Sequence, residues 1–121
     1  MKKLLITLLL ISPFSFADFG DVYYCQMTSG LGITFVGGRI EYTLGKFNFK
    51  LDETKNAMVF GKSGYFRNQI MKLRKNSGWP SEETWYADSR YARGYFSEGR
   101  FLYVSTGATG SVSITADCDK F

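Results

Sequence analysis

The last twelve residues of this 121-residue chain constrain its fold more than any other stretch. From Gly110 to Phe121 apolar and polar residues alternate, and Cys118 is one of the apolar residues. This period of two is typical of a β-strand with one buried face. The only other cysteine, Cys25, lies early in the sequence. We therefore expect a sheet that closes on itself, with a Cys25–Cys118 disulfide joining its first and last strands.

The first 17 residues have the features of a bacterial-type secretory signal peptide. Two lysines precede the apolar run Leu4–Ile11, and small residues end at Ala17. The run is far shorter than the ~20 residues that a transmembrane helix needs. We predict cleavage after Ala17, no transmembrane segment, and an exported protein that is periplasmic or extracellular. Two cysteines and an oxidising compartment favour a disulfide. The remainder, residues 18–121, is predicted to be a single all-β domain.

Glycine-rich turns divide this domain into about nine or ten short strands. Gly37-Gly38 predicts a hairpin between strands Ile33–Val36 and Arg39–Leu44, with a turn at Thr28–Gly32 before them. In Lys46–Asp52 the odd-numbered residues should face the core. The other predicted strands are Ala57–Gly61, Thr84–Ser89, Ala92–Ser97 and Arg100–Ser105. The fold class is therefore all-β, either a small antiparallel up-and-down β-barrel or a closed two-sheet sandwich.

The segment Tyr65–Arg74 is ambiguous. Phe66, Ile70 and Leu73 have helical spacing, whereas Met71 and Leu73 also fit a strand. We favour a strand because the neighbouring segments are strands. Gly78 and Pro80 would interrupt a strand ladder, so Asn76–Glu83 is predicted to be a loop.

The residues that most catalytic and metal sites need are missing. The sequence has no histidine, and the expected disulfide uses both cysteines, which excludes His-dependent triads and most zinc sites. The acidic residues fall mainly at turns or outward strand positions. We expect a protein that is not an enzyme and that has no metal or cofactor.

A basic stretch beside a tryptophan is the strongest candidate for a binding surface. Residues 62–75 contain five basic residues and no acidic one. Loops on a rigid β-scaffold often carry recognition. We predict that Trp79 is an aromatic anchor and that nearby cations contact an anionic surface, a glycan or a protein; these cations are Arg67, Lys72, Arg74 and Lys75. The alternatives are a solubilising strand face and a tryptophan that covers the barrel end.

The overall charge argues against a nucleic-acid partner. The formal net charge is +4, and loss of Lys2 and Lys3 with the signal peptide would lower it to +2. Aromatic residues make up 17% of the sequence, enough to fill a small core. Phe47, Phe49, Phe101 and Tyr103 are the best core candidates.

Together these features favour a small exported binding module, or an inhibitor of an extracellular enzyme, whose partner is not identified. The alternative is a carrier that holds an apolar small molecule inside an aromatic-lined barrel. A carrier needs a cavity of about 300 Å³ or more, whereas the many large rings predict a filled interior.

In outline the chain resembles the bacterial periplasmic inhibitors of C-type lysozyme. The resemblance consists of a small exported β-barrel, the segment Tyr23-Tyr24-Cys25 and a late Cys118. Members of that family carry a Ser-Gly-x-Arg-Tyr-like loop. The segment Ser63–Arg67 has the Ser-Gly pair but lacks the Arg-Tyr pair, so the resemblance assigns no function to this chain.

Overall fold

The described part of the chain forms one antiparallel sheet. The computed structural model describes residues 17–74 and 84–121, and within these ranges it contains nine strands and no helix. The strands are β1 (Val22–Thr34), β2 (Arg39–Glu41), β3 (Lys46–Asp52), β4 (Ala57–Phe60), β5 (Ile70–Arg74), β6 (Trp85–Ser89), β7 (Ala92–Ser97), β8 (Arg100–Gly107) and β9 (Gly110–Lys120). The predicted signal sequence, apart from Ala17, and the whole of the predicted Asn76–Glu83 loop lie outside the described residues.

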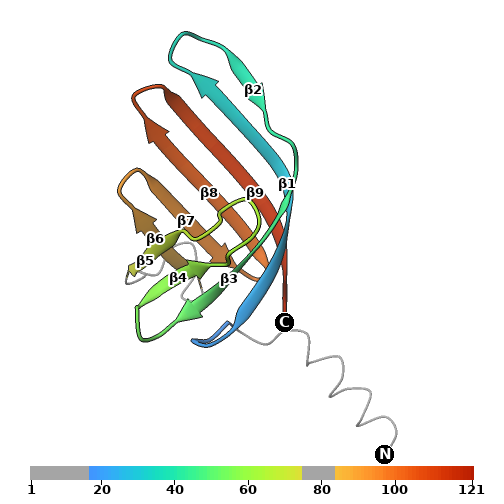
Figure 1. The fold of residues 1–121 in the computed structure, drawn as a ribbon, viewed down its shortest axis with the longest axis vertical. Coiled ribbons are helices and arrows are strands. Elements are labelled where there is room, and N and C mark those ends of the chain that lie inside the picture. Colours follow the sequence, from blue (N-terminus) through green and yellow to red (C-terminus); the bar gives the residue numbers. More distant parts are fainter. Residues whose placement is uncertain (1–16, 75–83) are drawn as a thin grey trace, which may run out of the picture.

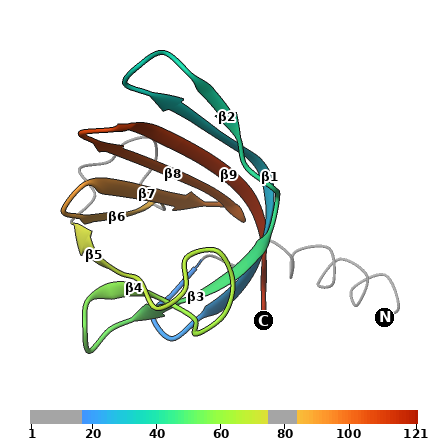
Figure 2. The same ribbon diagram turned by 45° about the horizontal axis from the view of Figure 1, so that its top comes forward.

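The sheet closes into a barrel of eight strands. Neighbours follow the order β1-β3-β4-β5-β6-β7-β8-β9, and β9 pairs back with β1. Figures 1 and 2 show the strands curving around one interior, with the β1–β2 hairpin extending beyond the other hairpins at one end. β2 is the extra strand, paired with the far end of β1. The all-β fold class and the closed barrel are therefore confirmed.

The Cys25–Cys118 disulfide is also confirmed. The two cysteines face each other in the β1–β9 register, and their sulfur atoms are 2.05 Å apart. Both are buried, with 3% and 8% of their surfaces exposed. Alternation along β9 is as predicted, since Ile114 and Ala116 are buried on the same face as Cys118. The bond thus joins the two strands that close the barrel.

The predicted turn at Thr28–Gly32 is wrong. β1 runs unbroken through this segment, with a register shift between Met27 and Ser29. The glycines are required by a close approach rather than by a turn. A Cβ atom on Gly32 would lie 2.9 Å from the Tyr42 hydroxyl, and one on Gly30 would lie 3.3 Å from the Tyr42 Cβ. The Tyr42 ring lies over Gly32, and the Tyr42 Cβ atom and the Met27 side chain lie beside Gly30. Both glycines therefore mark close packing inside a strand.

The first predicted hairpin is shifted along the sequence. The predicted strand Ile33–Val36 ends at Thr34, and its last two residues lie at the turn into β2. Gly37, with φ 94°, supplies the left-handed conformation that the turn needs. The predicted strand Arg39–Leu44 is shorter than expected and ends at Glu41.

The segment Tyr65–Arg74 is half strand and half turn. Only Ile70–Arg74 forms a strand, and Tyr65–Asn68 is a turn in which Asn68 has a φ of 62°. The ring of Phe66 is nevertheless 1% exposed, and it packs edge-on against Phe47 at 4.8 Å between ring centroids. The preference for a strand is therefore correct only for the second half of the segment.

Aromatic rings fill the core. Phe47, Phe49 and Leu51 of β3 face inward as predicted, and Phe101 is also buried, whereas Tyr103 is only partly buried. Ring centroids in the cluster lie 4.5–6.0 Å apart, and the cluster comprises Tyr23, Phe47, Phe49, Phe60, Phe66, Phe96, Phe101 and Tyr103. Such contacts stabilise a core beyond simple burial.

Tyr23 is the buried tyrosine of this cluster. Its ring lies 4.5 Å from that of Phe96. Burial raises the pKa of Tyr23 to about 12, and the negative charges of Asp21 and Asp18 add to the shift. The hydroxyl therefore stays protonated throughout the physiological pH range.

Candidate functional site

The structure describes three of the five predicted binding residues. Lys72 and Arg74 lie on β5 and point away from the core, because they alternate with the buried Met71 and Leu73. Arg67 is exposed in the turn that precedes β5. The other two predicted contacts, Lys75 and Trp79, lie outside the described residues. The structure therefore brings together Lys72 and Arg74 on the outer face of the barrel, whereas Arg67 lies apart in the turn.

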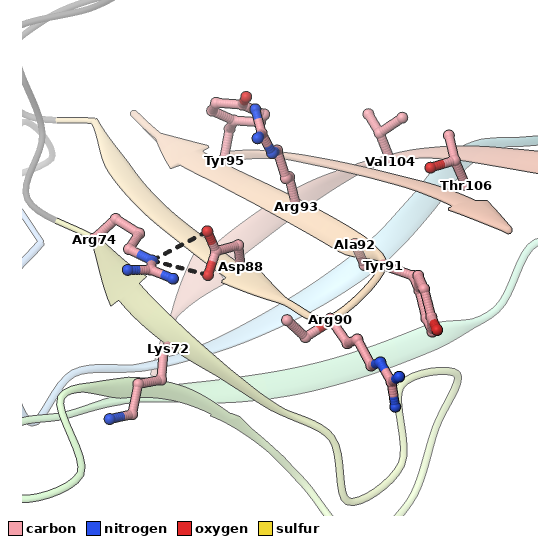
Figure 3. A pocket seen from close by; sticks show the side chains of 11 residues that line it. Lys72, Arg74, Asp88, Arg90, Tyr91, Ala92, Arg93, Tyr95, Val104 and Thr106 are labelled. Carbon is pink, nitrogen blue, oxygen red and sulfur yellow. Dashed lines mark hydrogen bonds and ion pairs between the residues drawn. The ribbon is translucent and has the colours of Figure 1, made fainter.

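Lys72 and Arg74 line an open groove on this outer face. The groove has a volume of about 870 Å³ and extends over β5, β6, β7 and β8. Figure 3 shows that Arg93 and Tyr95 of β7, and Arg90 of the β6–β7 turn, complete it. Its charged lining comprises four cationic residues and one acidic residue, Asp88. We call this site the outer groove.

One ion pair fixes part of the outer groove. Asp88 stands between Lys72 and Arg93 in the cross-strand register, but its carboxylate accepts hydrogen bonds from Arg74. The Arg74 Nε atom lies 3.0 Å from Oδ1 and 3.1 Å from Oδ2. In Figure 3 the Lys72 ammonium points away from this pair. Because one carboxylate faces four cations, the groove keeps an excess of positive charge.

Tyrosine rings lie among these cations. Tyr86 and Tyr95 are cross-strand partners on β6 and β7, and their ring centroids are 5.1 Å apart. The Arg93 guanidinium lies 6.0 Å from the centroid of the Tyr86 ring. At the β6–β7 turn the Arg90 guanidinium lies 5.2 Å from the centroid of the Tyr91 ring. Cation–π contacts of this length hold guanidinium groups over flat aromatic faces.

Sequence reasoning missed most of this face because it depends on strand register. Alternation alone places Tyr86 and Asp88 on one side of β6, and Arg93 and Tyr95 on one side of β7. Alternation does not show that β5, β6 and β7 are consecutive neighbours in the sheet, or that their outward-facing side chains lie side by side. The signal that could have been used was the hairpin turn at Arg90, which sets the register of β6 against β7.

A second pocket, of about 560 Å³, lies where the β1–β2 hairpin extends beyond the barrel. Tyrosine rings and hydroxyl groups contribute to its lining, among them Tyr42, Tyr91, Tyr103, Ser89 and Ser105. We call it the mouth pocket. Apolar side chains, including Ile33, Ile40 and Val112, complete the lining.

No cluster of three or more His, Cys, Asp or Glu side chains that could hold a metal ion occurs in residues 17–74 and 84–121. Across the same ranges no helix has the length and apolarity to cross a membrane. Comparison of the sequence with protein-family models and with curated proteins finds no match.

Proposed function

We propose that this protein is a non-enzymatic binding module that recognises an anionic glycan through the outer groove. The observation that supports the proposal most directly is the combination of four cationic side chains with a tyrosine pair on one open sheet face. Acidic groups of the ligand would contact Lys72, Arg90 and Arg93. The pair Tyr86–Tyr95 would contact the apolar faces of sugar rings.

The dimensions of the outer groove suit a short polymer segment. Neighbouring strands lie about 4.8 Å apart, so the distance from β5 to β8 is about 14 Å. The rigid sheet fixes the positions of the cationic side chains along this length. A pre-organised array of this kind loses little conformational entropy when it binds an extended ligand.

The carrier alternative receives less support. Inside the barrel, the rings of Phe47, Phe60 and Phe101 lie 5.1–6.0 Å from one another, which is contact distance for aromatic rings. An apolar cargo would therefore have to displace core rings.

The proposal is tested with two acidic polymers and a neutral one. Calorimetric titration with dextran sulfate and polygalacturonate should show binding, whereas neutral dextran should not bind. Binding should weaken as salt is raised towards physiological strength, where the Debye length falls to about 8 Å. Equal affinity for dextran and dextran sulfate would contradict the proposal.

Single substitutions locate the binding surface. Arg93→Ala should reduce affinity for the acidic polymers about tenfold, because it removes a charge-assisted hydrogen-bond donor. Tyr95→Ala should reduce affinity without changing the salt dependence. Lys50→Ala removes an exposed cation from β3, outside the outer groove, and serves as the matched control. If Arg93→Ala and Lys50→Ala have the same effect, the groove is not the binding site.

We also propose that the mature protein is exported and begins at Asp18. A disulfide is typical of oxidising compartments. The Asp18 backbone nitrogen donates a 2.8 Å hydrogen bond to Asp21, whose carboxylate also pairs with Lys120 at 3.1 Å. Cleavage after Ala17 would convert this nitrogen into an ammonium group and strengthen the contact. Intact-mass analysis of the protein secreted by a bacterial host tests this: a mass that includes residues 1–17 would refute it.

A further inference from the structure

The free edge of β2 is the most unusual surface in the described part of the molecule. Within residues 17–74 and 84–121, β2 pairs only with β1, at the end of the strand order. All three of its residues are exposed. Unpaired strand edges offer backbone groups to another strand.

The hydrogen-bond pattern shows which backbone groups face this edge. The Tyr42 amide donates to Gly30, and the Thr34 amide donates to Gly38. Hydrogen-bonded and non-hydrogen-bonded pairs alternate along an antiparallel ladder. The pair Gly32–Ile40, midway between these two, is therefore also hydrogen-bonded. It follows that the N–H and C=O groups of the residues on either side of Ile40 point away from β1.

Those two flanking residues carry opposite charges. Arg39 and Glu41 project from the same side of β2, and the Arg39 Nη2 atom lies 3.1 Å from the Glu41 Oε1 atom. Their side chains are 70% and 73% exposed. The edge therefore presents a cation and an anion on either side of Ile40, each with an outward-facing backbone donor and acceptor.

We infer that β2 pairs with β2 of a second copy of this chain in an antiparallel, two-fold symmetric dimer centred on Ile40. This arrangement places Arg39 opposite Glu41 of the second copy, and Glu41 opposite Arg39 of the second copy. Both pairs can exchange two backbone hydrogen bonds, because their N–H and C=O groups face outward. An isologous contact of this kind closes after two copies and does not extend further.

Charge complementarity selects this register over its neighbours. A slip of one strand by two residues, the smallest that keeps outward-facing backbone groups paired, would place Arg39 opposite Arg39 or Glu41 opposite Glu41, and like charges directly opposite are destabilising. At the symmetry axis Ile40, which is 41% exposed, would face its own copy. The sheet would become continuous across the two barrels.

Exposed apolar residues beside this edge add to the contact. Phe35 and Val36, at the tip of the β1–β2 hairpin, are 86% and 91% exposed, and Leu44 beyond β2 is 49% exposed. In an antiparallel dimer the hairpin tip of one copy lies alongside the segment that follows β2 in the other. The tip of one copy would then be covered by Leu44 of the second copy. Exposed apolar groups of this size are typical of interaction sites.

Charge-reversal variants test the dimer by analytical ultracentrifugation over a range of concentrations. The wild type should dimerise. Arg39→Glu gives β2 two acids and Glu41→Arg gives it two bases, so each variant alone should dissociate at least about tenfold more readily. An equimolar mixture of the two variants should recover the dimer, because each acid then faces a base. The double variant Arg39→Glu/Glu41→Arg should dimerise like the wild type.

The outcomes that overturn the inference are equally specific. A wild-type protein that stays monomeric at high concentration, or single variants that dimerise as well as the wild type, would exclude this interface. Failure of the mixture to recover the dimer would exclude the two-fold register. Lys55→Glu makes the same charge reversal in the exposed β3–β4 turn and should leave the dimer intact. Far-ultraviolet circular dichroism of each variant shows whether the barrel remains folded.

Discussion

The disulfide should contribute strongly to the stability of this barrel. Cys25→Ala/Cys118→Ala removes the bond while leaving apolar side chains at both buried positions. The cysteines are separated by 93 residues. In the chain-entropy model, a closed loop of this length stabilises the fold by ~4–5 kcal/mol, through restriction of the unfolded chain. The β1–β9 ladder stays in place, so the native barrel should form in the variant.

Urea unfolding at equilibrium measures this loss. With a slope of about 1.5 kcal/mol per molar urea, the midpoint should fall by about 3 M. The slope itself should rise, because the unlinked chain exposes more surface when it unfolds. Wild-type protein unfolded in the presence of a thiol reductant should behave like the double variant, which provides an independent control.

A loss of less than about 1 kcal/mol in the double variant, with an unchanged slope, would refute a stabilisation that comes from restriction of the unfolded chain. That result would mean that the linked and unlinked unfolded chains are equally compact.

Three further substitutions test the core and one turn. Phe49→Ala should destabilise the fold by about 3–5 kcal/mol, because four aromatic rings surround this side chain, which is 1% exposed. Urea unfolding measures the loss, and a value below about 1 kcal/mol would contradict the packing described. Gly64→Ala should lower the free energy of unfolding by about 1–3 kcal/mol, since Gly64 has a φ of 99° and an added Cβ would lie 2.5 Å from the Lys46 carbonyl oxygen. An unchanged melting temperature would exclude such a loss. The pKa of Tyr23 rises from its ordinary value of 10.0 to about 12 in the folded protein, so the folded state holds this proton more tightly than the unfolded chain does. The stability that results is complete below pH 10 and is lost between pH 10 and 12. Over that range the free energy of unfolding should fall by at most about 1.4 kcal/mol per pH unit. Tyr23→Phe should flatten the fall in stability over that window, and identical pH profiles for variant and wild type would refute the assignment.

The closure of the sheet was predictable because its signals are local and repeated. Alternation at Val112, Ile114 and Ala116 identifies the inward face of β9 without any knowledge of its neighbours. Phe47 and Phe49 do the same for β3. Two cysteines in a chain expected to be exported then leave one pairing.

The path of β1 could not be predicted from local signals. Gly30 and Gly32 have the composition of a turn, yet they lie in a strand, where the Tyr42 ring occupies the space over Gly32 and its Cβ atom lies beside Gly30. That ring comes from beyond the following hairpin, so the contact is visible only once the hairpin has formed. Glycine identifies a backbone position that tolerates no side chain, but it does not distinguish a turn from a close approach.

The candidate site was only partly predictable for the same reason. Lys72 and Arg74 stand out in the sequence because no acidic residue lies near them along the chain. The acidic residue that pairs with Arg74 is Asp88, which belongs to β6 and is close to Arg74 in space but not in sequence. Arg93 and Tyr86 come together through strand register, which the sequence does not contain explicitly.

The closing β1–β9 ladder has a consequence for the order of folding. Every other pairing joins strands that are consecutive in the chain or separated only by β2, and such hairpins form in about 1–10 μs. The β1–β9 ladder instead brings together residues as far apart as Cys25 and Cys118, and long-range pairings of this kind slow folding. A newly made chain should therefore acquire its local hairpins first, close the barrel last, and oxidise its cysteines only then. A chain that is unfolded later with the bond intact already holds its most distant contact, so it should refold faster and by a different route.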